Sequence, residues 1–303
     1  MIWLLLLTVG PFVLGALLAT LSWMVRGRSR RSADPGWGVL AAGAVLVLGG
    51  LAMQLMAGPV SLPLDLPIDA WQWYSEIQFA IPLLLGVAAL VLAAFPVENR
   101  KGTGSADLAP RTAMSFVRGR WLVAPALVLA ILLVATVTAG VASRPDATTG
   151  RYTAYFVSLG GERSMGTSIY GWFYSVPCLV LVGLLLAIAT LDLFLISRPA
   201  LDHDRDRDVN ARTSRARNVI FIGTGALLVH LGLVLTSLAG ASSLQSQLST
   251  LEGDVTVWTS FAALQPLLRI ASYASAAIGF ALWSAVALSA TPSRRRMPAA
   301  AGA

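Results

Sequence analysis

The fold is decided by residues 171–196, GWFYSVPCLVLVGLLLAIATLDLFLI. Aromatic residues and a proline open this stretch, a long apolar run follows, and Asp192 is its one acidic residue. A helix needs about 20 consecutive apolar residues to cross the hydrocarbon core of a bilayer. Because Arg198 follows the stretch after a single serine, we predict a transmembrane helix that leaves the bilayer on the cytoplasmic side.

The composition of the whole chain has the same character. Of its 303 residues, 56% are hydrophobic and only 12% are charged, and the mean hydropathy is +0.72. A soluble domain of this length is far less apolar. The composition therefore predicts an integral membrane protein.

Further apolar runs predict further helices, so we expect an all-α integral membrane protein with seven transmembrane helices. One helix would be followed by three hairpins, each going out and coming back. A single membrane domain would cover residues 1–303, with a flexible cytoplasmic tail at 291–303. The predicted spans are about 2–25, 38–57, 77–97, 121–141, 171–197, 218–240 and 261–290.

The basic residues predict the orientation of these spans. The chain has 22 Lys and Arg, and only Arg144, Arg151 and Arg163 fall in the loops that would be outside. Loops on the cytoplasmic side of a membrane carry an excess of Lys and Arg. We therefore expect a multi-pass protein of the cytoplasmic (inner) membrane, with the N-terminus outside and the C-terminus in the cytoplasm.

Polar residues within the spans are the candidates for a functional site, because each is costly to place in a bilayer. Arg269 lies about two helical turns inside the seventh span, and His230 lies at a similar depth in the sixth. We expect a polar pocket open to the outside, with Arg269 within reach of Glu76, Gln78 or Gln54, directly or through one water. The candidate residues are Arg269, Glu76, Gln78, Gln54, His230, Gln265 and Tyr273.

Purely structural interpretations of the same residues stay open. Arg269 could extend to the outer headgroups, while His230 and the glutamines join helices through hydrogen bonds. Asp192 lies near the cytoplasmic end of its span. We favour a structural carboxylate there, with Arg198 as a candidate partner, over a proton relay.

Small residues at four-residue spacing predict where the last two spans touch. Glycine, alanine and serine allow helix backbones to approach closely in a membrane. The expected contact residues are Gly232, Thr236 and Gly240 on one helix and Ala271, Ser275 and Gly279 on the other.

Two charged segments, 98–120 and 198–217, are predicted to lie in the cytoplasm. Either could dock a protein partner, such as a separate ATPase. The second segment contains DHDRDRD at 202–208, in which carboxylates alternate with arginines. Because the opposite charges largely cancel and only one histidine is present, we expect a solvated linker rather than a metal site.

Several classes of site are not expected. The chain has no GxxxxGK[ST], HExxH, GxSxG or CxxC pattern, which leaves no known motif for a nucleotide, a catalytic metal or a nucleophile. Cys178 is the single cysteine, so an internal disulfide is excluded. The basic residues lie in short loops between spans, which argues against nucleic acid as a partner. We expect no cofactor and no metal.

Three functions remain as hypotheses. The favoured one is a permease-like transporter of a small solute, or a membrane subunit of a transport complex, with an outward-facing polar pocket. The first alternative is a non-catalytic structural or accessory subunit, whose internal polar groups would pair with one another and leave no cavity. The second is an intramembrane enzyme acting on a lipid or peptide, with Arg269 binding an anionic head group and Glu76 or His230 acting as base.

Overall fold

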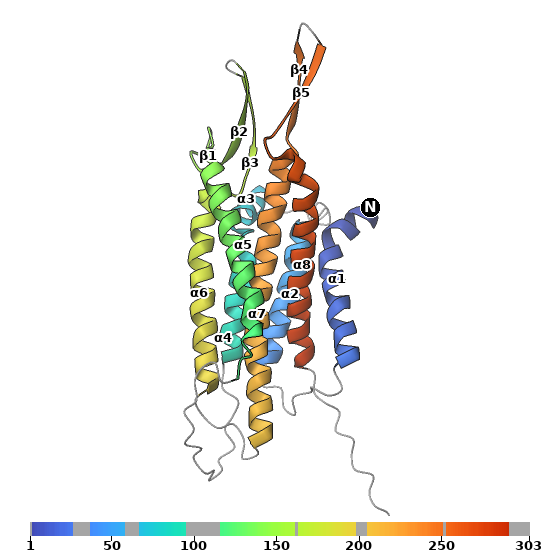
Figure 1. Cartoon of the computed structure of the whole chain (residues 1–303), viewed down its shortest axis with the longest axis vertical. Coiled ribbons are helices and arrows are strands. Elements are labelled where there is room, and N and C mark those ends of the chain that lie inside the picture. The colour runs from blue at the N-terminus through green and yellow to red at the C-terminus, as the bar shows by residue number, and fades with distance from the viewer. Residues whose placement is uncertain are drawn as a thin grey trace, which may run out of the picture.

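The computed structural model describes residues 2–26, 37–57, 67–94, 116–160, 163–197, 205–250 and 253–290. Its helices run side by side along one axis, and two groups of β-strands extend beyond one end of the bundle (Figure 1). We call this end the hairpin end. The predicted tail at 291–303 lies outside the described residues.

Helices make up most of the described chain, as the composition predicted. They are α1 (Ile2–Arg26), α2 (Trp37–Ala57), α3 (Ile68–Ile77), α4 (Ile81–Ala94), α5 (Arg120–Ala142), α6 (Trp172–Ser197), α7 (Arg205–Ser242) and α8 (Gln265–Ser289), with the short 3₁₀ helix η3 (Ala262–Leu264) ahead of α8. Five of them are long and apolar enough to cross a membrane, or six if the bent pair α3–α4 forms one span. The protein is therefore a multi-pass helical membrane protein.

The predicted third span, 77–97, differs most from the structure. The axes of α3 and α4 are bent by 72° across the break between them. Pro82 lies in the first turn of α4, and because proline has no backbone N–H, the hydrogen-bond ladder of a continuous helix is interrupted there. One straight helix is thus replaced by a short helix, a turn and a second helix.

α7 is the central helix of the bundle. In its apolar stretch 72% of the residues are buried, compared with 22% to 39% in the other candidate spans. It packs against α4, α5, α6 and α8, and α8 also contacts α1 and α2. α5 and α6 expose apolar side chains such as Val134 and Val180 on their outer faces, which is the surface expected of helices that face lipid.

α7 is also longer than predicted. It begins at Arg205 rather than near Asn218, so much of the segment 198–217 is helical instead of a solvated linker. Asp208 and Arg212 in this segment are buried. The expectation of a fully hydrated charged linker was wrong for these two residues, because they pair with each other inside the fold. Of the other charged segment, 98–120, only residues 116–120 are described.

The segments predicted as outer loops contain strands. β1 (Arg144–Pro145), β2 (Tyr152–Gly160) and β3 (Arg163–Ser168) form an antiparallel sheet in that order, and β4 (Gln245–Thr250) pairs with β5 (Gly253–Trp258) in a second one. The Tyr155 ring of β2 packs edge-on against Phe261 at 5.6 Å between centroids. The two groups of strands are therefore joined at their bases.

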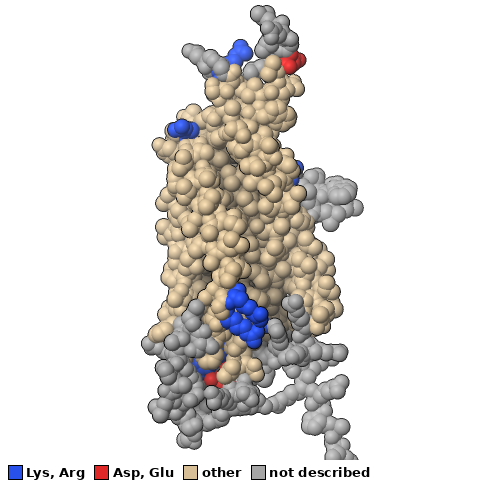
Figure 2. Space-filling model, in the orientation of Figure 1, with Lys and Arg blue, Asp and Glu red and all other residues tan. Residues whose placement is uncertain are grey.

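The basic side chains on the visible face lie mainly near the two ends of the molecule (Figure 2). On the visible face, basic side chains gather near the two ends, and the surface between them is largely uncharged (Figure 2). This is the distribution expected when the middle of the bundle lies in hydrocarbon.

Candidate functional site

The residues predicted to share one pocket lie in separate places. Arg269 is exposed on α8, and its side chain makes no hydrogen bond or ion pair within the described ranges. Gln54 is buried in α2. Gln78 donates from its side-chain amide to the carbonyl oxygen of Ser75, 3.0 Å away in its own chain segment. The structure therefore does not bring Arg269 into contact with Glu76, Gln78 or Gln54.

Glu76 is paired with a residue that the sequence analysis did not consider. Its Oε1 accepts a hydrogen bond from Nη1 of Arg151, in the loop before β2. The guanidinium of Arg151 also lies 4.4 Å from the centre of the Phe173 ring. Both partners of the ion pair are about two-fifths exposed, so the pair contributes at most about 1 kcal/mol to stability. Glu76 thus ties the bent helix pair to the sheet.

His230 is buried in α7 and holds the bend between α3 and α4. Its Nδ1 lies 2.8 Å from the carbonyl oxygen of Phe79, which is in the turn between the two helices. A carbonyl oxygen can only accept, so Nδ1 donates to it. Nε2 lies 3.3 Å from the hydroxyl of Tyr170 and, in the neutral ring, accepts from it. His230 therefore satisfies a backbone group that the broken helix leaves without a helical donor.

Tyr170 completes this buried group from the segment just ahead of α6. Burial raises the pKa of its hydroxyl well above the ordinary value, so the hydroxyl keeps its proton and remains a donor. Its ring packs on Phe79 with centroids 4.8 Å apart. Three elements that are distant in sequence meet at these side chains, which is the role of a helix-joining group rather than of a solute site.

A second buried group, at the end opposite the strands, was not predicted. Nε of Arg212 lies 2.9 Å from both carboxylate oxygens of Asp208, and Nη1 donates to the carbonyl oxygen of Ile196 at 2.6 Å. Phe116 covers the guanidinium, 5.2 Å from its ring centre. The pair fastens the end of α6 to α7. The i, i+4 spacing of Asp208 and Arg212 is the sequence signal that could have revealed the pair, since residues four apart are neighbours on one helix face.

Asp192 is also buried, with a side chain only 2% exposed. Neither carboxylate oxygen has a hydrogen-bond partner among the described residues. Arg215 on α7 acts on it electrostatically, while the predicted partner Arg198 lies outside the described residues. Asp192 is thus a buried carboxylate without a hydrogen bond in the described part of the chain, and the charge that acts on it belongs to α7.

The contact between α7 and α8 is close, as the small residues predicted, but its residues differ in part. A Cβ at Gly279 would lie 2.6 Å from Cγ2 of Val229, and a Cβ at Gly232 would lie 3.2 Å from Cβ of Ala276. Ser272 and Ala276 face Gly232, in place of the predicted Ala271 and Ser275. A Cβ at Gly240 would meet nothing within 4 Å, and the hydroxyl of Thr236 bonds to the carbonyl of Gly232 in its own helix.

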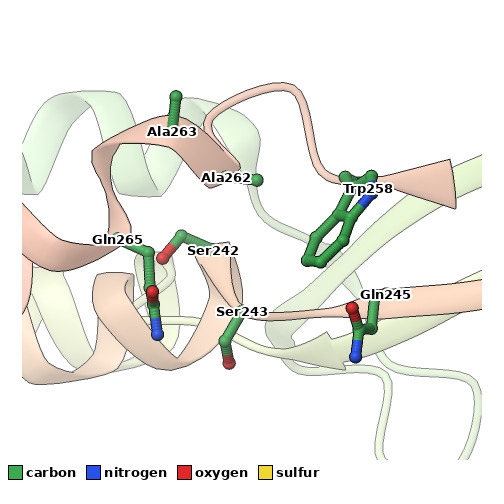
Figure 3. Close-up of a pocket in the computed structure, with 7 residues that line it drawn as sticks. All are labelled: Ser242, Ser243, Gln245, Trp258, Ala262, Ala263 and Gln265. Atoms are coloured by element: carbon green, nitrogen blue, oxygen red, sulfur yellow. The ribbon is translucent and has the colours of Figure 1, made fainter. Parts of the chain in front are cut away.

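One open pocket of about 500 Å³ lies at the base of the β4–β5 hairpin. It has no charged lining residue, and Gln265 is the one member of the predicted set that lines it (Figure 3). The lining residues are Ser242, Ser243, Gln245, Trp258, Ala262, Ala263 and Gln265. Arg269 is not among them.

Tyr273, the last member of the predicted set, lies at the contact of α8 with α1. A Cβ at Gly10 would fall 2.2 Å from the Tyr273 hydroxyl oxygen, so this hydroxyl lies against the backbone of α1. Within the described ranges there is no group of three or more His, Cys, Asp or Glu side chains that could hold a metal ion.

Comparisons with protein-family models, with curated proteins and with solved structures find no match to this chain. The site therefore has to be interpreted from its own geometry. Its buried polar groups join helices, and its surface pocket is uncharged.

Proposed function

We propose that the chain is a non-catalytic subunit of a membrane assembly, the first alternative left open by the sequence. The observation that supports this proposal is the pairing of buried polar groups within the bundle. His230 is bonded to Tyr170 and Phe79, and Asp208 is bonded to Arg212. A transporter or an intramembrane enzyme would instead turn such groups towards a cavity that admits a substrate.

The exposure of Arg269 supports the same choice. A solute pocket built around this arginine required it to point into the bundle, beside Glu76 or Gln54. Arg269 is exposed instead, and Glu76 is paired with Arg151. The favoured hypothesis of an outward-facing pocket around Arg269 therefore has less support than a structural role.

We propose seven spans for this subunit, made by α1, α2, the α3–α4 pair, α5, α6, α7 and α8. The hairpin end would lie outside the cytoplasmic membrane and the opposite end in the cytoplasm. The positive bias of the loops predicted to be cytoplasmic supports this orientation. In Figure 1 the N-terminus lies on the side of the bundle nearer the strands, as an outside N-terminus requires.

The strands are the surface that we propose for a partner protein. They extend beyond the bundle (Figure 1) and expose apolar side chains, including Phe156 on β2 and Val255 on β5. Exposed apolar residues on strands outside the bilayer mark surfaces that other proteins cover. The charged segments 98–120 and 198–217 remain a second candidate surface at the opposite end.

Site-specific crosslinking tests this proposal in cells that produce the full chain. A photoreactive residue at Phe156 or Val255 should yield discrete protein adducts, because a partner covers the strands. The same residue at Val180, on the lipid-facing side of α6, should yield none. Gln54→Cys in a Cys178→Ser background should resist an impermeant thiol reagent, because Gln54 is buried in α2. Rapid labelling of Gln54→Cys without adducts at the strands would favour the transporter.

A further inference from the structure

We infer that Arg269 binds the phosphate group of an anionic phospholipid, on the face of α8 that adjoins α1 at the hairpin end of the bundle. The inference starts from an unmatched charge. Arg269 is exposed on a helix apolar enough to cross a membrane. Across the described ranges its guanidinium makes no hydrogen bond, ion pair or ring contact.

The apolar residues closest to Arg269 in the sequence are exposed on an adjoining side of α8. Leu267 and Ile270 are more than three-fifths exposed, and Ile278 is about half exposed. At about 3.6 residues per turn, these three residues share one side of α8, next to the side that carries Arg269. Exposed apolar side chains on a helix long and apolar enough to cross a membrane are expected to face hydrocarbon. A guanidinium stays protonated in such a place, and the described residues supply no anionic partner for it.

The direction of the helix sends the side chain towards the headgroups. In an α-helix each Cα–Cβ bond tilts towards the N-terminus, and the N-terminus of α8 is at the hairpin end. α8 begins at Gln265, so Arg269 lies only about 6 Å along the axis from its start, at about 1.5 Å per residue. The guanidinium is therefore directed towards the hairpin end, where the outer headgroup layer would lie.

Tyr273 places the site at a seam between two helices. It lies one turn beyond Arg269 on α8, and its hydroxyl lies against Gly10 of α1. α1 and α8 are in close contact along their length, since a Cβ at Gly15 would lie 2.6 Å from the carbonyl oxygen of Ala277. A lipid held by Arg269 would thus lie over the α1–α8 seam and cover it.

The chemistry selects the headgroup. The planar guanidinium donates two parallel hydrogen bonds to a phosphate, a geometry that a lysine ammonium does not reproduce. A zwitterionic lipid carries its own cation beside the phosphate, so a lipid with net negative charge gains more from Arg269. Phosphatidylglycerol is the probe that represents this class.

Native mass spectrometry of the purified full chain tests the inference. The protein is exchanged into an equimolar mixture of phosphatidylglycerol and phosphatidylcholine, and the ratio of the two bound lipids is measured. The wild type should retain phosphatidylglycerol preferentially. Arg269→Gln should lower the preference about fivefold, the effect expected of one basic side chain at an anionic surface. Arg269→Lys should lower it less, because the charge is kept.

Arg163→Gln is the matched control. Arg163 is exposed on β3, beyond the bundle, so its loss should leave the preference unchanged. An unchanged preference in Arg269→Gln, or an equal loss in Arg163→Gln, would overturn the inference. Displacement of the lipid by inorganic phosphate at constant ionic strength would assign the site to a soluble anion instead, and would also overturn it.

The inference can be tested without the glutamine variant if that variant does not fold. Raising the salt concentration should weaken the preference of the wild type for phosphatidylglycerol, because salt screens an exposed charge pair. A wild type with no preference at low salt would refute the lipid site directly.

Discussion

At the scale of single residues, the buried arginine of α7 is matched by an acidic residue of the same helix. Arg212 is completely buried and is matched by Asp208 and by the carbonyl oxygen of Ile196. Replacing a buried ion pair by apolar residues can be neutral, but removing one partner leaves the other charge uncompensated. Substituting only one of the two residues, Asp208 or Arg212, therefore measures the cost of leaving the other charge buried without its partner.

We expect Asp208→Ala to destabilise the protein by about 3 to 5 kcal/mol, because it leaves the Arg212 guanidinium buried and unpaired. Thermal unfolding in detergent measures the loss. Glu76→Ala is the control, since its ion pair with Arg151 is exposed and should cost about 1 kcal/mol or less. Equal losses in the two variants would contradict the distinction between the buried and the exposed pair.

His230 supports a second prediction at this scale. His230→Ala removes the donor to the Phe79 carbonyl and should cost about 1 to 3 kcal/mol, the penalty of a buried acceptor left without a partner. Tyr170→Phe removes only the longer hydrogen bond and should cost about 0.5 to 1.5 kcal/mol. His230→Asn, whose amide can donate from nearly the position of Nδ1, should recover part of the loss.

The measurement for these three variants is again unfolding in detergent, at equal protein and detergent concentrations. A Tyr170→Phe variant less stable than His230→Ala would show that the hydroxyl, and not the bond to the bend, is the important contact.

At the scale of elements, the decisive contact is that of α7 with α8. Glycines on both helices bring the backbones together, and Gly279 has both Val229 and the Gly225 carbonyl within 3 Å of its missing Cβ. The stripe predicted from four-residue spacing does not continue to Gly240. An α-helix has 3.6 residues per turn, so residues four apart drift around the helix, and the stripe leaves the interface.

This geometry gives a prediction with two internal controls. Gly279→Leu should destabilise the protein by about 1 to 3 kcal/mol or more, because the new side chain forces the helices apart. Gly240→Leu and Gly183→Leu place the same side chain where nothing lies within 4 Å. They should stay close to wild type in detergent unfolding. A uniform loss in all three variants would contradict the packing explanation, because leucine is a better helix former than glycine and should not by itself destabilise a helix.

At the scale of the whole molecule, the orientation in the membrane can be tested with single cysteines. In a Cys178→Ser background, Ser158→Cys on β2 should react with an impermeant thiol reagent in intact cells, because the hairpin end would lie outside. Ser105→Cys and Ser293→Cys, outside the described residues, should react only after the cells are opened. Labelling of position 105 or 293 in sealed cells would reverse the proposed orientation.

The sequence by itself determined that this is a helical membrane protein, because a bilayer accepts only long apolar segments with their backbone hydrogen bonds satisfied internally. The approximate spans followed from residues 171–196 and similar runs. Small residues also indicated that α7 and α8 would touch near Gly232 and Gly279. Apolar runs and small residues are features of a single segment, so they can be recognised without knowing what that segment contacts.

Only the tertiary structure decided which polar groups meet. Glu76 pairs with Arg151, 75 residues away, and His230 bonds to a carbonyl 151 residues away. Such partners depend on the bend between α3 and α4 and on the rotation of each helix about its axis. Depth along a span placed Arg269 and His230 at one level, but rotation turned Arg269 out of the bundle and His230 into it. A hydropathy pattern this uniform says little about rotation, since apolar residues surround every helix.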